Sequence, residues 1–333
     1  MKHLSLLTAI GMLLSLSGIS CEIRSNPDAR SKLEVSGSLD ILSAGTGSTD
    51  GQTARGRPAD ARPGGVEQAG EAEMKALAQA YPNRIEEIAF RNEDWALRIG
   101  DTWYFWAKGR LLPEELRLQW EEYASYRFYS YSLDLPPLPV LDEESKLRLR
   151  ERLERAEDNP PRRSEAFLAD LYRSATRGKT EARIGTVELV GFDVRVHEQI
   201  VEPLRKVNRA LEALAEIDPG VQRFVAGLNG VAGYNWREIA GTRSRSYHSY
   251  GVAIDLTPKS FGGRHTYWRW ALPHSDEWYA IPYEQRWMVP LQIVKIFEEQ
   301  GFVWGGKWFY FDTMHFEYRP EILILAKASG DRR

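Results

Sequence analysis

Cysteine is almost absent from this chain, because Cys21 is the only one among 333 residues. No disulfide can therefore form within the chain, and a structural zinc site built from several thiolates is excluded as well. Cys21 follows directly after an N-terminal apolar segment, so its role must be sought in that position.

An excess of charge of one sign is also lacking. The chain has 44 Lys and Arg residues against 47 Asp and Glu residues, which gives a formal net charge of -3. Acidic and basic residues are mixed along most of the sequence, so it has no basic stripe of the kind that neutralises phosphates. We therefore expect no nucleic-acid partner.

Long apolar runs are rare, and the longest candidate lies within residues 1–20, which read MKHLSLLTAIGMLLSLSGIS. No later run is long and apolar enough to span a bilayer. A lysine near the start and an apolar run of roughly a dozen residues, too short to span a bilayer, are typical of an export signal. The following SGIS-Cys21 resembles a bacterial lipoprotein signal, which predicts a lipidated Cys21 and a membrane-anchored protein in the cell envelope. Gly18 stands where the usual lipoprotein box has leucine, so ordinary signal-peptidase cleavage is the alternative.

Composition divides the remaining chain into segments. Residues 21–72 are rich in Gly, Ser, Ala, Asp and Arg, and such a segment buries too little apolar surface to offset its ordering entropy, which predicts a flexible linker. Residues 73–180 read as an α+β accessory region of unknown role. Residues 181–325 read as one catalytic α+β domain, and residues 326–333 as a short tail.

Within the accessory region, large apolar residues alternate around Gly100-Asp101, which predicts a β-hairpin. Charged and amphipathic patterns predict helices over 143–159 and 164–176, the second with Ser164 as its N-cap. We interpret the aromatic residues of the hairpin as its half-buried core, with a groove for a glycan or peptide as the alternative. These residues are Trp95, Trp103, Tyr104, Phe105 and Trp106.

The catalytic domain is predicted to hold a small antiparallel sheet flanked by helices. A strand pair over 186–200 leads into an amphipathic helix over 197–217, which Asp218-Pro219-Gly220 ends. A second helix lies within 282–302 and is bent or started late by Pro290. Further strands are predicted at 221–228, 233–240, 251–256 and 307–319.

The stretch SYHSYGVAID contains His248 and Asp255 within otherwise apolar sequence. A continuous strand would separate residues seven apart by roughly 23 Å and place them on opposite faces, and a helix would still separate them by about 10 Å. The segment must therefore bend, and Gly251 is the residue that allows it. A loop before a strand could then bring both side chains to one metal ion.

Two ligands leave a zinc site incomplete, and FDTMHFE supplies His315 as the third. Three protein ligands leave one tetrahedral position for water, which distinguishes a hydrolytic zinc site from a structural one. A hydrolytic site also requires a proton acceptor. Asp312 can serve if its segment turns locally, and Glu317 is the competitor because it lies on the same strand face as His315.

Three further histidines are interpreted as core residues, since they have no partner motif, and two tryptophans are interpreted as core residues because aromatics near a strand usually pack there. The tryptophans have the alternative of lining the site. These residues are His197, His265, His274, Trp304 and Trp308.

SYHSYGVAID matches S-x-H-x-x-G-x-A-x-D, and WGGKWFYFDTMHFE matches W-G-G-x-W...D-x-x-H-F-E. Over residues 185–325 the chain thereby resembles the zinc D-alanyl-D-alanine carboxypeptidase (VanY-like) metallopeptidase family, which also contains L-alanyl-D-glutamate endopeptidases. The resemblance implies His248, Asp255 and His315 as zinc ligands and Asp312 as the base.

The resemblance also implies an arginine upstream of the first histidine that steadies a substrate carboxylate or oxyanion. Arg237 stands in the matching Y-x-x-R context, and Arg243 and Arg245 are the alternatives, because the spacing from Arg237 is short. Ser246 is interpreted either as ordering the loop before His248 or as touching substrate.

The resemblance implies a zinc metallopeptidase that hydrolyses stem-peptide bonds of bacterial peptidoglycan, and the predicted export signal agrees with this location. An L-alanyl-D-glutamate endopeptidase of the same family and a non-catalytic peptidoglycan-binding lipoprotein are the alternatives. The expected partners are peptidoglycan stem peptides and, through the lipid anchor, a membrane.

Overall fold

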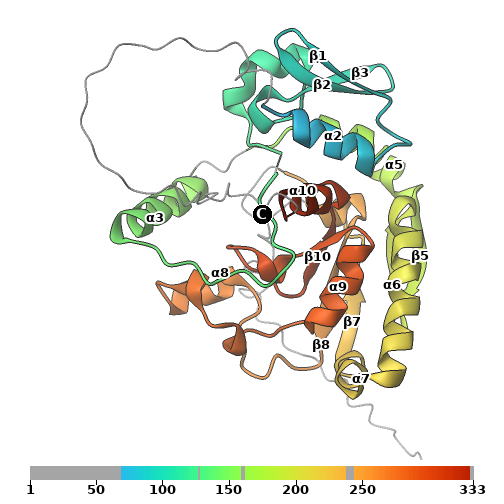
Figure 1. Cartoon of the computed structure of the whole chain (residues 1–333), viewed down its shortest axis with the longest axis vertical. Coiled ribbons are helices and arrows are strands. Elements are labelled where there is room, and N and C mark those ends of the chain that lie inside the picture. The colour runs from blue at the N-terminus through green and yellow to red at the C-terminus, as the bar shows by residue number, and fades with distance from the viewer. Residues whose placement is uncertain (1–68, 127, 159–161, 238–243, 331–333) are drawn as a thin grey trace, which may run out of the picture.

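The computed structural model describes residues 69–126, 128–158, 162–237 and 244–330. The predicted export signal, Cys21, most of the predicted linker and Arg243 lie outside these residues. Among the helices of the described residues, none has the length and apolar character needed to cross a bilayer. The fold is α+β, with short antiparallel sheets and helices around them (Figure 1).

The N-terminal region forms an antiparallel sheet of order β1-β2-β3-β4, with a helix packed against it. The predicted hairpin is confirmed, since Ile99 pairs with Thr102 across the turn at Gly100 and Asp101. Of its aromatic residues, Tyr104 and Phe105 are fully buried. The elements are α2 (Glu71–Ala80), β1 (Glu87–Arg91), β2 (Asp94–Ile99), β3 (Thr102–Phe105) and β4 (Leu112–Pro113), with 3₁₀ turns at Ala107–Gly109 and Glu114–Glu122.

Three helices connect this region to the rest of the chain: α3 (Glu143–Asp158), α4 (Ala166–Leu171) and α5 (Arg177–Glu181). The helix predicted over 143–159 is confirmed as α3, whereas the helix predicted over 164–176 forms only over Ala166–Leu171, as α4. The predicted cap of the second is wrong, because Glu165 rather than Ser164 precedes α4 and no side chain caps it. Leu149 of α3 packs into an aromatic cluster built from residues beyond 266.

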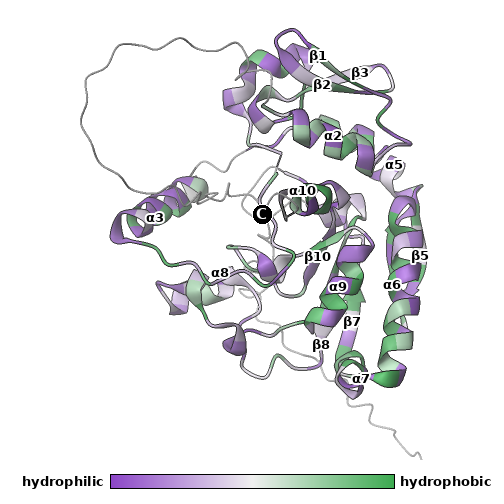
Figure 2. Ribbon diagram, in the orientation of Figure 1, coloured by the Kyte–Doolittle hydropathy of each residue, from purple (hydrophilic) through white to green (hydrophobic). Residues whose placement is uncertain are grey.

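The predicted strand pair and long helix are confirmed as the β5–β6 hairpin and α6. The buried residues of α6 recur at helical spacing, and Figure 2 shows hydrophobic and hydrophilic residues alternating along this helix. The predicted strand over 221–228 is wrong, because it forms α7 except at its end. Asp218 accepts hydrogen bonds from the Gly220 and Val221 amides, and Pro219 occupies the first turn, so a new helix begins. The elements are β5 (Ile184–Leu189), β6 (Phe192–His197), α6 (Glu198–Ile217) and α7 (Pro219–Ala226).

A second antiparallel sheet has the order β7-β8-β10-β9. The strand predicted over 251–256 is confirmed as β8, and the helix that starts late after Pro290 as α9. The elements are β7 (Leu228–Ala232), β8 (Ala253–Pro258), α8 (Trp268–Ala271), α9 (Leu291–Glu299), β9 (Phe302–Trp304), β10 (His315–Tyr318) and α10 (Pro320–Gly330), with 3₁₀ turns at Tyr247–Tyr250, Leu272–His274, Trp278–Ala280, Tyr283–Gln285 and Gly305–Lys307.

Two predicted strands of this part are wrong in extent. Residues 233–237 are not in a strand, and the rest of the segment 233–240 lies outside the described residues. Only the last part of 307–319 is a strand, because the backbone turns before β10: the Asp312 amide donates to the Gly305 carbonyl at 3.0 Å. The turn is what allows Asp312 and His315 to come from one short segment.

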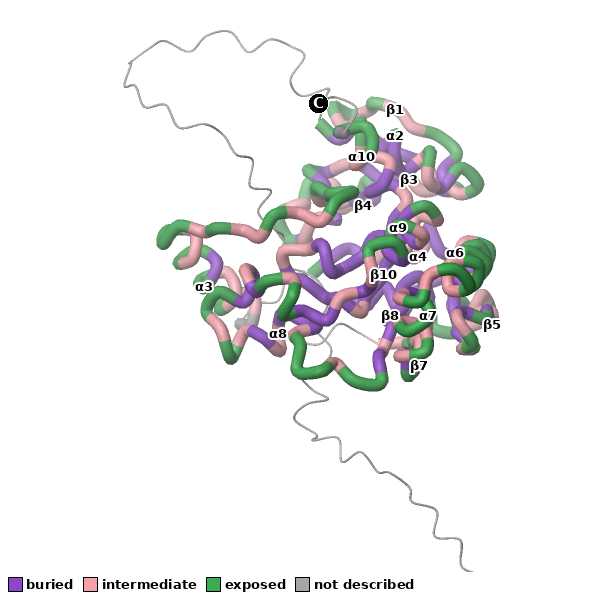
Figure 3. The backbone as a smooth tube through the Cα atoms, turned by 60° about the horizontal axis from the view of Figure 1, so that its bottom comes forward, coloured by how far each residue is buried: buried purple, intermediate pink, exposed green. Residues whose placement is uncertain are grey.

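One hydrophobic core runs through both sheets. It includes Leu77 of α2, Tyr104 of β3, Leu204 of α6 and Phe316 of β10. The buried stretches in Figure 3 are densest around β8 and β10, at the centre of the molecule. Helix α10 packs against α2, so the C-terminal helix is enclosed between the N-terminal region and the second sheet (Figure 1). The accessory region thus shares its core with the catalytic region.

Gly251 ends the 3₁₀ turn before β8 with a φ of +70°. A Cβ atom there would lie 2.6 Å from Ile184 Cδ1 and 2.8 Å from the His197 amide nitrogen. We expect Gly251→Ala to lower the free energy of unfolding by about 3 kcal/mol. The cost of an alanine in a left-handed backbone conformation and the cost of its steric overlap with neighbouring atoms are additive. Chemical denaturation measures it.

Gly100→Ala is the matched control, since Gly100 also has a positive φ of +58° but no atom within 4 Å of a Cβ. It should cost about 1 kcal/mol. Equal losses in the two variants would show that packing around Gly251 plays no part.

Candidate metal centre

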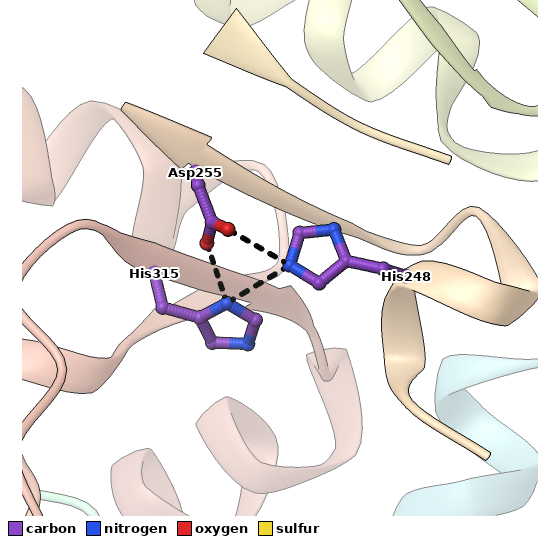
Figure 4. Close-up of side chains that lie close together, drawn as sticks. All are labelled: His248, Asp255 and His315. Atoms are coloured by element: carbon purple, nitrogen blue, oxygen red, sulfur yellow. Dashed lines mark hydrogen bonds and ion pairs between the residues drawn. The ribbon is translucent and has the colours of Figure 1, made fainter. Parts of the chain in front are cut away.

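The structure brings His248, Asp255 and His315 together, although 60 or more residues separate His315 from the other two. His248 lies in the 3₁₀ turn before β8, Asp255 in β8 and His315 in β10. Asp255 and His315 are direct partners in the antiparallel β8–β10 ladder, which puts both side chains on one face of the sheet. Figure 4 shows the three groups converging.

The contacts among the three are short. His315 Nδ1 lies 2.8 Å from Asp255 Oδ1, and His248 Nε2 lies 3.2 Å from Asp255 Oδ2. The two ring nitrogens lie 3.3 Å apart. No fourth His, Cys, Asp or Glu side chain joins this group within the part of the chain that the structure describes.

The loop that carries His248 is fixed at both ends. The Ser246 hydroxyl accepts a hydrogen bond from the His248 amide at 3.2 Å, and Gly251 closes the turn. The His248 carbonyl accepts from the Asn235 amide at 3.1 Å. The structure therefore places Ser246 where it orders the loop, the first of its two predicted roles.

Hydrogen bonds at the far side of each ring determine which nitrogen faces the centre. His248 Nδ1 lies 2.7 Å from the Gly233 carbonyl, and His315 Nε2 lies 3.2 Å from Glu317 Oε1. A carbonyl and a carboxylate can only accept, so these two nitrogens carry protons and donate. The opposite nitrogens, His248 Nε2 and His315 Nδ1, then present lone pairs when the rings are neutral.

Three acceptors consequently meet at one point: two imidazole lone pairs and the Asp255 carboxylate. Acceptors at 2.8–3.3 Å from one another repel unless a cation lies among them. Nitrogen and oxygen donors of this kind suit zinc and related divalent ions. The residues present therefore fit a metal ion.

Exposure is uneven around the centre. The imidazoles of His248 and His315 keep 4% and 3% of their side-chain surface, whereas Asp255 keeps 27%. The centre is thus reached from solvent on the side of Asp255, and the two histidines form its buried wall.

Electrostatics agree with a site built for positive charge. Burial raises the pKa of Asp255, but His248 and His315 outweigh it and hold this pKa well below its ordinary value. Burial lowers the pKa of His315, but hydrogen bonds and charges from Asp255 and Glu317 bring it well above its ordinary value. The same acceptors can hold either a proton or a metal ion, so metal binding would compete with protonation at this centre.

Asp312, the predicted base, lies in the turn before β10 and is 8% exposed. Its backbone bridges to Tyr267, and its carboxylate accepts weakly from the Met314 amide at 3.4 Å. Burial raises the pKa of Asp312 to about 7, with His315 lowering it and Asp255 raising it. A carboxyl group that titrates near neutral pH can both take up and return a proton.

Glu317, the competing base, has a different position. Its Oε1 faces His315 Nε2, and its Oε2 lies 3.6 Å from Arg319 Nη1. Glu317 therefore orients a ring rather than facing the open side of the centre. Sequence reasoning considered Glu317 only as a base and missed this role, although its spacing of two residues from His315 on one strand was the available sign.

The candidate arginines differ. Arg245 is 8% exposed, and its guanidinium donates to the Ser174 and Ser249 carbonyls and stacks on Tyr250 at 3.9 Å. Arg245 is therefore a structural residue. Arg237 runs beside the His248 loop, since its amide donates to Ser249 Oγ at 2.8 Å.

The other singled-out side chains fall into two groups. His197 is a buried core residue, as predicted, and His265 is only partly buried, whereas His274 is exposed, so the prediction is wrong for His274. Trp304 is fully buried and donates to the Thr313 carbonyl at 2.8 Å. The Trp308 ring lies 5.7 Å from His315 and borders the centre.

Comparison with known families connects this geometry to a function class. Residues 240–318 match the family model described as D-alanyl-D-alanine carboxypeptidase, a range that contains Ser246 and every group of the centre but begins after Arg237. Residues 73–128 match a domain of unknown function. Comparisons with curated proteins and with solved structures gave no match. The matched family supports a carboxypeptidase-like peptidase.

We expect the full chain to bind one divalent zinc ion. His248→Ala, Asp255→Ala or His315→Ala should lose it, because each removes one of the three donors that meet within the described residues. Elemental analysis after extensive dialysis measures the zinc content. His274→Ala, at an exposed histidine, is the control and should keep the ion. A triad variant that retains stoichiometric zinc would remove that residue from the ligand set.

Proposed function

We propose that this protein is a zinc-dependent peptidase of the D-alanyl-D-alanine carboxypeptidase type, which hydrolyses stem-peptide bonds of bacterial peptidoglycan. The observation that carries the proposal is that three hydrogen-bond acceptors meet at one point. Hydrogen bonds to Gly233 and Glu317 fix the orientations of the two imidazole rings. The family match over residues 240–318 supports the reaction class.

His248, Asp255 and His315 would hold the ion. When bound, zinc supplies a Lewis acid that activates water and polarises a peptide carbonyl. Three ligands rather than four suit this use, because a catalytic site keeps a position open. The exposed side of Asp255 is where a substrate can approach.

Asp312 is the general base in this proposal. Its carboxylate takes the proton from the attacking water and returns it to the leaving amine, a role for which a pKa of about 7, raised by burial, is suited. Glu317 serves the reaction indirectly, by holding the Nε2 proton of His315.

Arg237 is proposed to bind a carboxylate or the oxygen that becomes negative. A planar, permanently charged guanidinium suits both groups. The hydrogen bonds of its backbone to the His248 loop support its place beside the centre. Arg245 is not proposed for this role, because it already binds main-chain carbonyls.

The proposed location is the cell envelope, with the protein anchored at the membrane through a lipidated Cys21. The N-terminal sequence supports this proposal, since an export signal precedes the cysteine. An extracytoplasmic peptidase would meet peptidoglycan, so the proposed location and substrate agree.

We expect the full chain to release defined fragments from purified muropeptides, to lose this activity with a chelator and to regain it with zinc. Mass spectrometry identifies the bond: loss of one alanine indicates a carboxypeptidase, and a cut between L-alanine and D-glutamate indicates an endopeptidase. Retention on peptidoglycan without any fragment would favour the binding protein and refute the proposal.

We expect Asp312→Asn to lower kcat by about 10²–10⁴-fold, because an amide cannot accept the proton. Its zinc content should stay the same, since Asp312 is not among the three donors. Asp276→Asn, at an exposed carboxylate, is the control for steady-state assays. A variant at Asp312 with full activity would transfer the base to another residue.

A further inference from the structure

Arg319, two residues beyond Glu317, is a fully buried cation close to the metal centre. Its Nη1 lies 3.6 Å from Glu317 Oε2, and its Nε donates to Oε1 of Glu321, which is also fully buried. Glu317 Oε1 faces His315 Nε2 at 3.2 Å, so Glu321 is joined to a predicted metal ligand through hydrogen bonds and one longer contact, the 3.6 Å ion pair of Arg319 with Glu317.

The other end of this chain is held by the N-terminal region. Tyr81, directly after α2, donates its hydroxyl to Glu321 Oε2 at 3.1 Å. Tyr126 donates to Glu321 Oε1 at 3.1 Å, and its ring lies 4.8 Å from the Arg319 guanidinium. Both tyrosines belong to the range 73–128 that matches a domain of unknown function.

Burying these charges is costly, so the arrangement requires an explanation. A buried ion pair is often no more stabilising than apolar residues of the same volume, but removing one partner is strongly destabilising. What such a pair provides is a fixed geometry. The planar fork of Arg319 spans two carboxylates, and two hydroxyls from another region fix the second carboxylate.

We infer that the N-terminal region is a working part of the metal centre. Tyr81 and Tyr126 hold Glu321, Glu321 holds Arg319, Arg319 orients Glu317, and Glu317 fixes the ring of His315 with Nδ1 toward the metal. The four residues beyond Glu317 in this chain are positioning residues, not ligands. The inference rests on the proposed metal centre and assigns the accessory region a role in it.

A purely structural role for the tyrosines makes a different prediction. Loss of a hydroxyl would then lower the thermal stability and leave the metal affinity of the folded protein unchanged. A positioning role changes the affinity and the ligand field of the ion, because groups that orient a ligating histidine typically contribute about 10–100-fold to metal affinity.

The experiment uses the full chain loaded with Co²⁺ or Zn²⁺, in competition with a chromophoric chelator, well below the melting temperature. We expect Tyr81→Phe combined with Tyr126→Phe to weaken zinc binding about tenfold, and Glu317→Ala about 10–100-fold. The visible absorption of bound Co²⁺ should change in both. Glu317→Gln should restore much of the affinity, because its amide oxygen still accepts from His315.

Tyr104→Phe is the matched control. Tyr104 lies in the same region, and its hydroxyl donates to Asp170 Oδ2 of α4 at 2.6 Å, a bond that also joins the N-terminal region to later residues but does not lead to Glu321. This variant should keep the affinity and the Co²⁺ spectrum. If the double variant does not fold, Tyr126→Phe alone keeps the ring beside Arg319 and removes only one hydroxyl.

The outcomes separate the two proposals. If the unaltered chain binds neither Co²⁺ nor Zn²⁺, the metal centre itself is wrong and the inference falls with it. If the unaltered chain binds the ions and the tyrosine and Glu317→Ala variants bind them equally well with the same spectrum, the inference is wrong and the proposed function stands. An equal loss in Tyr104→Phe would also overturn it, in favour of a general loosening between the regions.

Discussion

The structure depends on one electrostatic constraint: three hydrogen-bond acceptors face one another at about contact distance, and none of them can donate to the others while the rings are neutral. The β8–β10 ladder imposes half of this arrangement by pairing Asp255 with His315. The turn closed by Gly251 imposes the rest. The backbone therefore holds two imidazole lone pairs and one carboxylate close together, and a positive charge between them is needed to offset their repulsion.

Groups on the side of the rings that faces away from the centre fix the orientations of His248 and His315. The Gly233 carbonyl accepts the Nδ1 proton of His248, and Glu317 accepts the Nε2 proton of His315. Behind Glu317, the buried pair Arg319 and Glu321 continues these polar contacts into the core. On the other side, Asp255 stays partly exposed. The same elements that bury the histidines therefore leave one approach free, which is the asymmetry a hydrolytic centre needs.

The sequence alone could predict the donors but not their surroundings. His248, Asp255 and His315 could be predicted because their spacing and flanking motifs occur together, and Gly251 could be predicted as the residue at which the segment bends. The helix over 219–226 was missed because its apolar residues resemble a strand, whereas the Asp218 cap decides otherwise. The contacts of Tyr81 and Tyr126 with Glu321, and of Arg245 with Ser174, could not be predicted, since they join residues far apart in the chain.

The hydroxyl of Tyr81 meets Glu321 across 240 positions of sequence, and that of Tyr126 across 195. Loop closure over such distances comes late, because its entropy must be spent before the contact forms. Tyr81 and Tyr126 are therefore synthesised long before α10, the last described helix, which carries their acceptor Glu321. Until α10 has packed against this region, the polar chain behind His315 is incomplete, so the centre is completed only when the N-terminal and C-terminal parts of the described chain have come together.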